Sequence, residues 1–223
     1  MRAARVLIAV CALMAPVDAQ TNRRGWREIA TADDRRRLRG WRTAWMAALP
    51  AARAGGGATA IAADPVFFDP DRALHDPVPP AGAYRCRKFR LGARGAGAPH
   101  FVTHQASPCR VGEDGRFAKV DGPQRPIGVI YPETTGRAVF LGTMVLGDER
   151  KAMRYGRDAT RDMAGWVERI DDTRWRIVLP YPRFESVLDV VELVPDTVGT
   201  TGGGTTASLG ATAGAGSDGS EGR

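Results

Sequence analysis

The alternation of apolar and polar residues between positions 83 and 194 predicts a series of short strands. Glycine, proline and aspartate clusters separate the segments, as they do at the turns of β-hairpins. Even spacing with hairpin-length connections is typical of a meandering antiparallel barrel or a strongly curled sheet. The predicted strands are residues 83–91, 101–104, 109–111, 116–120, 127–131, 138–146, 165–170, 174–179 and 187–194.

Two kinds of strand can be distinguished by their faces. In 174–179, Trp175, Ile177 and Leu179 point to one face and Arg174 and Arg176 to the other, which is the period of a half-buried strand. In 138–146 and 187–194 apolar residues occupy both faces. Strands of that kind must be covered on both sides, so we expect a barrel interior on one side and a helix on the other.

The covering helix is predicted from residues 31 to 54, and Gly55 follows its end. Thr31 can cap its first turn and Asp33 and Asp34 suit the helix dipole there. Pro50 removes a backbone donor and predicts a kink or break nearby. The fold class is therefore α+β: an N-terminal helix, kinked or broken near Pro50, packed on a curled antiparallel sheet or barrel of about eight strands. The apolar face of the helix is predicted to pack on the core through Leu38, Trp41, Trp45 and Leu49.

The two ends of the chain differ from this domain in composition. Residues 1–19 combine Arg2 and Arg5, an apolar run and a small-x-small site, which predicts a secretory signal peptide. The apolar run is shorter than the ~20 residues that a bilayer span needs, so we expect no membrane span after cleavage. Residues 20–195 are predicted to form a single domain, and the Thr/Gly/Ala-rich tail 196–223 to be disordered.

The number of cysteines that remain after cleavage is consistent with export. Cleavage removes Cys11 and leaves Cys86 and Cys109, a pair that favours a disulfide in an oxidising compartment. Two free thiols or a metal site are the alternatives. The spacing lacks the C-x-x-C pattern of structural zinc, so no metal and no cofactor are predicted, and the predicted location is periplasmic or secreted.

The net charge of the chain gives little information about its binding partners. The formal charge is +7, and all but three of the 32 basic residues are arginine. This preference for arginine is a compositional bias of the whole chain. A basic surface can hold anionic polymers of the cell envelope. No nucleic-acid recognition motif is present, so nucleic acid is not expected as a partner, and the sequence does not determine an oligomeric state.

Two groups of residues are candidates for chemistry. His100 and His104, with a strand carboxylate, would suit an envelope hydrolase, although no H-E-x-x-H, G-x-S-x-G or glycine-rich phosphate loop accompanies them. A polar mouth for an anionic or sugar-like ligand is the second candidate; the alternative is a loop whose arginines and aspartates pair with one another. The residues of this candidate ligand-binding site are Tyr155, Arg157, Asp158, Arg161, Asp162 and Trp166.

Four stretches together resemble a known family: ATADDRRRLRGWRTAW at 30–45, YRCRKFRLG at 84–92, the run at 147–170 and the run at 174–195. They are similar to an uncharacterised domain-of-unknown-function family of exported alphaproteobacterial proteins. The resemblance implies a periplasmic or extracellular location and a helix followed by strands, and it implies no activity. A looser similarity to lipocalin-like barrels rests on architecture only.

The function expected from these observations is non-catalytic. We expect a protein that binds a small apolar or anionic envelope ligand, or a protein partner, in or on the barrel. An envelope hydrolase using His100 or His104 and a protease-inhibitor-like module are the alternatives.

Overall fold

Nine antiparallel strands form between residues 82 and 195 of the computed structural model, which describes residues 25–147, 149–183 and 186–196. Every predicted strand is present, and the bounds differ by a few residues at most. The α+β class is confirmed. The strands are β1 (Gly82–Ala93), β2 (Phe101–Thr103), β3 (Ser107–Val111), β4 (Arg116–Lys119), β5 (Gln124–Pro132), β6 (Ala138–Leu146), β7 (Asp162–Asp171), β8 (Arg174–Pro180) and β9 (Ser186–Pro195).

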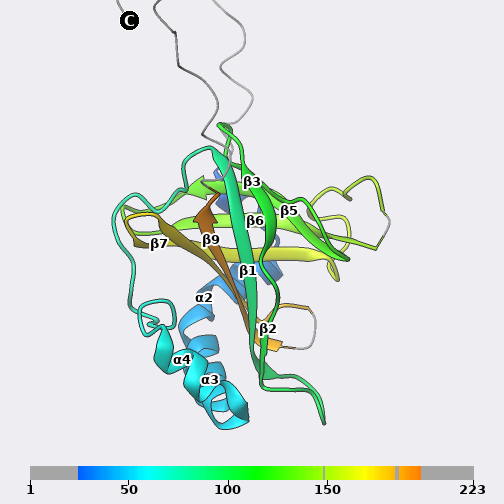
Figure 1. Ribbon diagram of the computed structural model, residues 1–223. Helices are drawn as coiled ribbons and strands as arrows, with labels where there is room; N and C mark the ends of the chain where they lie inside the picture. The colour runs from blue at the N-terminus through cyan, green and yellow to red at the C-terminus, as the bar shows by residue number, and fades with distance from the viewer. Residues whose placement is uncertain (1–24, 148, 184–185, 197–223) are drawn as a thin grey trace, which may run out of the picture.

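The sheet closes on itself through its first and last strands. The order is β2-β1-β3-β4-β5-β6-β7-β8-β9, and β1 also pairs with β9 from Tyr84 to Ala93. Because β1 is long, its first half pairs with β3 and its second half with β2 (Figure 1). Strands β1 and β3 to β9 therefore form an eight-stranded barrel, and β2 pairs with β1 beside it.

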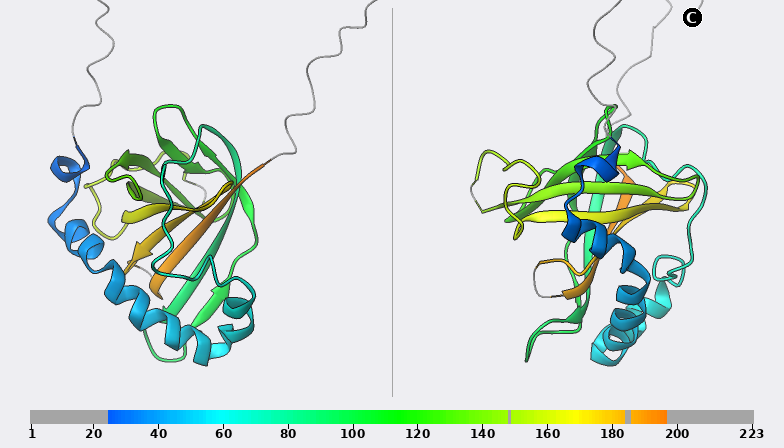
Figure 2. Two further views of the ribbon diagram at one scale, coloured as in Figure 1. Left: turned by 90° about the vertical axis from the view of Figure 1, so that its left-hand side faces the viewer. Right: turned by 180° about the vertical axis from the view of Figure 1, so that it is seen from behind.

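The helical segment runs along one side of this barrel (Figure 2). It comprises α1 (Trp26–Ile29), α2 (Ala32–Arg39), α3 (Trp41–Ala52), a π-helical turn (Arg53–Gly57) and α4 (Ala58–Ala63). Thr31 caps α2 as predicted, because its hydroxyl accepts a hydrogen bond from the Asp34 amide at 3.1 Å. No helix in the described part of the chain is long and apolar enough to cross a bilayer.

The helix is interrupted at two places. The pattern predicted a break near Pro50; α3 includes Pro50 and ends at Ala52, and the kink follows at Gly55 and Gly56, where Gly56 has φ +97°. A second break, at Gly40 between α2 and α3, was not predicted. It separates α2, which contacts β7 and β8, from α3, which contacts β1, β8 and β9.

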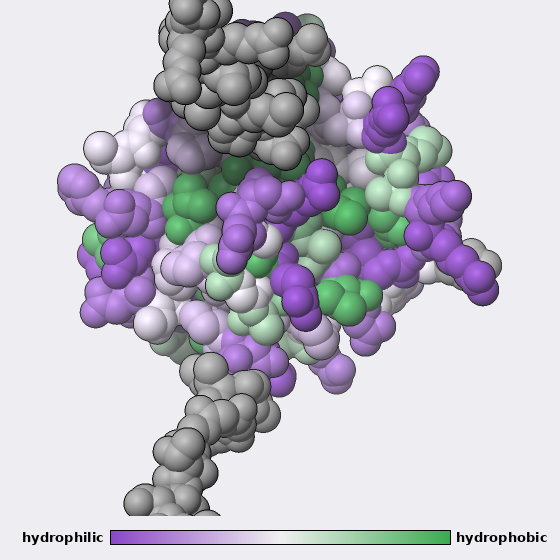
Figure 3. Space-filling model, turned by 90° about the horizontal axis from the view of Figure 1, so that it is seen from above, coloured by the Kyte–Doolittle hydropathy of each residue, from purple (hydrophilic) through white to green (hydrophobic). Residues whose placement is uncertain are grey.

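Three apolar clusters result, one inside the barrel and two between the barrel and the helices. The helix α3 packs on β1, β8 and β9, and α2 packs on β7. Trp45 and Leu38 of the predicted helix face are fully buried, Leu49 is buried, and Trp41 is half-buried. On the face seen from above, hydrophobic side chains lie among hydrophilic ones, and hydrophilic side chains project at the left and right edges (Figure 3). The prediction that the helix covers the doubly apolar strands is confirmed.

Arg176 is buried although the alternation of residues along its strand predicted an exposed side chain. Arg176 is on the outer face of β8, yet it has no exposed surface. Its guanidinium donates to the Glu168 carboxylate at 2.8 Å and lies 5.2 Å from the centre of the Trp45 ring. Carbonyl oxygens of Phe67, Asp69 and Arg72 accept its other protons. The connector before β1 thus supplies the partners that a buried cation requires.

Cys86 of β1 and Cys109 of β3 form a disulfide, with their Cα atoms 5.9 Å apart, as predicted. Both side chains belong to the cluster inside the barrel. The predicted signal peptide and the tail beyond residue 196 lie outside the described residues.

Candidate ligand-binding site

Aromatic side chains fill one end of the barrel, and a cavity occupies the other. At the filled end, the rings of Tyr84 and Trp175 meet edge to face with centroids 6.2 Å apart, and the Tyr84 hydroxyl donates to the Pro80 carbonyl at 2.6 Å. Towards the opposite end of β1 and β8 lies a cavity of about 680 Å³. That volume is in the range of small-molecule sites, roughly 300–1,000 Å³.

The deep wall of the cavity is apolar. Its side chains all belong to the interior cluster and come from strands all round the barrel, so barrel closure is what brings them together. The methionines are flexible and polarizable, which lets such a wall adapt to the shape of an apolar group. The wall consists of Cys86, Phe117, Met144, Met163, Leu179 and Val191.

Three cationic side chains line the outer part of the cavity. Lys88 and Arg90 follow Tyr84 and Cys86 on the inward face of β1, and Lys119 ends β4. The Lys88 ammonium donates to the Gln124 amide oxygen at 2.9 Å, and the Lys119 ammonium donates to the carbonyl oxygens of Asp121 and Gln124. Burial, with the nearby charges of Lys88 and Arg125, lowers the pKa of Lys119 despite the opposing effect of Asp121.

One carboxylate lies among these cations. Asp189 faces Arg90 across the β1–β9 pair, and its oxygen is 3.8 Å from the Lys88 ammonium. The Ser186 hydroxyl donates to the other Asp189 oxygen. Asp189 is thus fixed by its neighbours and reduces, without cancelling, the positive charge of the cavity.

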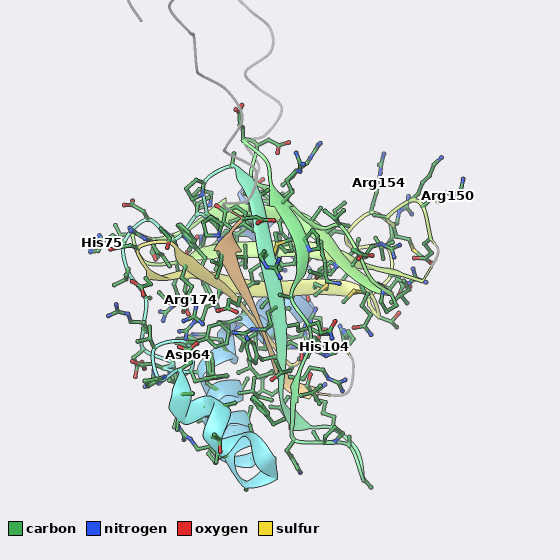
Figure 4. All side chains as sticks on the ribbon, viewed as in Figure 1. Asp64, His75, His104, Arg150, Arg154 and Arg174 are labelled. Atoms are coloured by element: carbon green, nitrogen blue, oxygen red, sulfur yellow. A yellow bond between two sulfur atoms is a disulfide. The ribbon has the colours of Figure 1, made fainter. Side chains whose placement is uncertain are left out.

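Two buried polar atoms in the cavity wall are unsatisfied. His104 Nε2 and Ser107 Oγ have no hydrogen-bond partner among the described residues. Figure 4 shows His104 beside β1. Burial first, and then the charges of Lys88, Arg90 and Lys119, lower the pKa of His104, so its neutral form is favoured. Unsatisfied polar atoms of this kind cost roughly 1–3 kcal/mol each unless a ligand or water pairs with them.

This arrangement can accommodate a molecule that has an apolar part and a polar part. It offers an apolar surface at depth and several hydrogen-bond donors near the opening, which is the usual composition of a small-molecule site. No three His, Cys, Asp or Glu side chains in the described residues are grouped closely enough to hold a metal ion. Binding and orientation of an amphipathic molecule is what these groups can perform.

The two histidines of the hydrolase alternative do not act together in this geometry. His100 and His104 flank β2, but the His100 ring accepts a hydrogen bond from the Ala93 amide at 3.1 Å. Its Cβ lies against Gly55 of the π-helical turn, outside the barrel. Only His104 lines the cavity.

The candidate residues between 155 and 166 form a network of their own. The Tyr155 hydroxyl donates to Asp34 of α2 and accepts from the Thr31 amide at 3.1 Å. Arg161 forms ion pairs with Glu149 and Asp158, and the Asp158 carboxylate also accepts a hydrogen bond from the Thr160 amide. The Asp162 carboxylate accepts from the Gly156 amide, and the Trp166 indole donates to the Leu38 carbonyl. The Arg157 side chain is exposed. These contacts attach α2 to the barrel. Ligand binding by this segment stays a prediction.

Sequence reasoning missed the cavity residues, although β1 carried a signal for them. The disulfide places Cys86 on the inward face, and the period of two then places Lys88 and Arg90 on that face as well. Lys119, His104 and Asp189 come from other elements. Their convergence depends on barrel closure, which no local pattern encodes.

The fold and the cavity define a class of protein: a closed antiparallel barrel, covered on one side by helices, with an internal cavity that is apolar inside and polar at its opening. The chain belongs to the family described as "Domain of unknown function (DUF4893)", whose family model matches residues 26–193. No curated protein and no solved structure matches the chain with significance. Function must therefore be argued from the cavity itself.

Proposed function

We propose that this protein is an exported, non-catalytic binding protein that holds one small amphipathic ligand in the barrel cavity. The observation that carries the proposal is the division of a cavity of about 680 Å³ into an apolar wall and a polar opening. An apolar group inside gains the free energy of burial, and the polar opening orients the rest of the molecule.

Export is supported by two observations. Cys86 and Cys109 form a disulfide inside the barrel, and disulfides persist in oxidising compartments such as the periplasm. Residues 1–19 have the charge and apolar run of a secretory signal.

A neutral apolar dye tests the binding function without assuming any charge on the ligand. The fluorescence of N-phenyl-1-naphthylamine should rise when it enters the cavity. Leu146 is half-buried at the end of β6 and lines the cavity, so Leu146→Trp should fill part of it and weaken dye binding by about tenfold or more, or 1.4 kcal/mol.

The matched control places the same residue on the outside. Ile127 of β5 is 36% exposed and is not part of the interior cluster, so Ile127→Trp should leave dye affinity unchanged. Equal dye affinity in the two variants, or no binding by the folded parent protein, would overturn the proposal.

A further inference from the structure

The loop between β6 and β7 carries a group of exposed cationic side chains. Within residues 25–147, 149–183 and 186–196, none of them forms an ion pair or a side-chain hydrogen bond. The nearby carboxylates already have a partner, because Arg161 pairs with both Glu149 and Asp158. Residues 150–157 themselves include no carboxylate, so this part of the loop keeps its full positive charge. The cations are Arg150, Lys151, Arg154 and Arg157.

The loop is fixed to the rest of the molecule on both sides of these cations. The Arg125 guanidinium of β5 donates to the Glu149 carbonyl at 2.8 Å, and the Tyr155 hydroxyl donates to a carboxylate of α2. Figure 4 shows Arg150 and Arg154 on this side of the molecule, with their side chains pointing outward. The barrel and α2 therefore hold a positively charged surface in place.

An exposed apolar side chain lies among the cations. Met153 is 42% exposed and stands between Lys151 and Arg154 in the chain. It lines a groove of about 490 Å³ on the outer face of β5 and β6, and Ile127, which is 36% exposed, lines the same groove. An apolar group surrounded by cations is typical of proteins that attach to an anionic bilayer, because the apolar group enters the interface and the cations attract the headgroups.

A bilayer fits this surface better than a protein does. Protein interfaces usually centre on aromatic anchors, and Tyr155, the one aromatic residue between β6 and β7, already holds α2 through its hydroxyl. A second copy of the chain would bring the same positive charge to the contact, and like charges repel. An anionic bilayer instead offers many negative headgroups, which long cationic side chains can approach in any orientation.

We propose that the loop at residues 149–161 is a docking surface for a bilayer of anionic phospholipid. Met153 enters the interface, and the four cations contact the phosphates of the headgroups. Leu146 and Gly147, just before the loop, line the barrel cavity, so docking places that end of the barrel beside the membrane. The proposal goes beyond the proposed function and does not depend on what the cavity holds.

Co-sedimentation with lipid vesicles tests the attraction to negative charge. The parent protein should bind vesicles of about 30% phosphatidylglycerol in phosphatidylcholine about tenfold or more tightly than vesicles of phosphatidylcholine alone. Added salt should weaken the binding, because it screens exposed charges. Equal affinity for the two kinds of vesicle would overturn the proposal.

Matched arginine variants locate the surface. Arg150→Gln/Arg154→Gln should weaken binding to the anionic vesicles by about tenfold or more, since each cation near the headgroups contributes about fivefold. The control Arg53→Gln/Arg85→Gln removes two exposed arginines at the end of α3 and on β1 and gives the same net charge. It should change the affinity by about twofold or less. Equal losses in the two variants would show that only the net charge matters and would overturn the docking surface.

The parent protein supplies a readout at the apolar side chain. Methionine labelled with ¹³C in its methyl group gives an NMR signal for Met153 and one for Met46, which is 58% exposed on α3. Phosphatidylglycerol nanodiscs with nitroxide-labelled acyl chains should broaden the Met153 signal and leave the Met46 signal sharp. Equal broadening of the two signals, or a sharp Met153 signal in the bound protein, would overturn the proposal.

A soluble polymer separates the bilayer from an acidic protein as the partner. Poly-L-glutamate offers negative charge without an apolar interface, so it should bind about tenfold or more weakly than the anionic vesicles at the same charge concentration. Equal affinity would assign the surface to an acidic protein and overturn the membrane proposal. Dye binding in the cavity is measured without lipid, so failure of the vesicle experiments would leave the proposed function intact.

Discussion

Replacement of Trp45 tests whether the helix α3 is an integral part of the barrel. Trp45 has no exposed surface and belongs to the cluster that joins α3 to β1, β8 and β9. Its ring also lies 5.2 Å from the guanidinium of Arg176, which is buried with Glu168. Trp45→Ala would therefore open a large cavity next to a buried ion pair.

The expected cost follows from the size of the side chain. Removal of a buried tryptophan costs about 3–5 kcal/mol, a large part of the roughly 5–15 kcal/mol that stabilises a typical domain. For a chain of this length each kcal/mol lowers Tm by about 2–4 °C, so a fall of about 6–20 °C is expected. Trp41 is half-buried beneath the Arg137 guanidinium at 4.3 Å, so Trp41→Ala should cost less.

Calorimetry and urea unfolding of the single and double variants provide the assay. Met46 follows Trp45 on the other face of the helix and is 58% exposed, so Met46→Ala should change the free energy of unfolding by no more than about 0.5 kcal/mol. A Trp41→Ala/Trp45→Ala protein that melts like the parent would show that α3 contributes nothing to the barrel, and the account of the fold would be wrong.

Three further predictions concern pH and packing. Burial and nearby cations hold the pKa of His104 below its ordinary 6.5. The unfolded chain therefore takes up a proton at a higher pH than the folded protein does, and the free energy of unfolding should fall as the pH drops through 6.5 and below. His104→Asn should flatten this dependence of stability on pH, measured by urea unfolding at several pH values, and an unchanged dependence would contradict the prediction. Burial raises the pKa of Tyr84 from 10.0 to about 12, so the free energy of unfolding should fall as the pH rises through that interval. Tyr84→Phe should remove this loss of stability. A spectrophotometric titration in which Tyr84 ionises near pH 10 would refute the prediction. A Cβ at Gly142 would collide with the Ile127 carbonyl and the Phe140 ring, whereas a Cβ at Gly136 would have its nearest neighbour 3.8 Å away. Gly142→Ala should therefore destabilise the protein by about 1–3 kcal/mol or more, and Gly136→Ala should destabilise it by little. Equal urea midpoints for the two variants would count against the packing described.

Local patterns predicted much of this fold. Residues 138–146 and 187–194, apolar on both faces, were predicted to lie between an interior and a helix. In the structure α3 contacts β9, and Val139 and Leu141 of β6 lie in one cluster with Trp26 of α1 and Leu38 of α2. The break at Gly40 was missed because a glycine within a strongly periodic helix gives no clear stop. The burial of Arg176 was missed because its partners come from the connector at Phe67 to Arg72, more than a hundred residues earlier in the chain.

The candidate site was predicted less well, and for a related reason. The Tyr155–Trp166 segment was singled out because its charges lie close together in sequence, yet those charges contact α2 and one another. The cavity residues are far apart in sequence: Asp189 reaches Lys88 because β1 pairs with β9, and Lys119 reaches it through the β1–β3 and β3–β4 pairs. Sequence patterns report neighbours within an element and do not report which inward-facing side chains converge after closure.

The central claim is that the barrel cavity holds a small organic molecule. Native mass spectrometry of the protein purified from the cells that naturally produce it measures this directly. The account predicts a population with added mass that collisional activation releases, present in the parent and in Ile127→Trp and lost in Leu146→Trp. A parent protein that carries no added mass, or an added mass that Leu146→Trp retains in full, would contradict it.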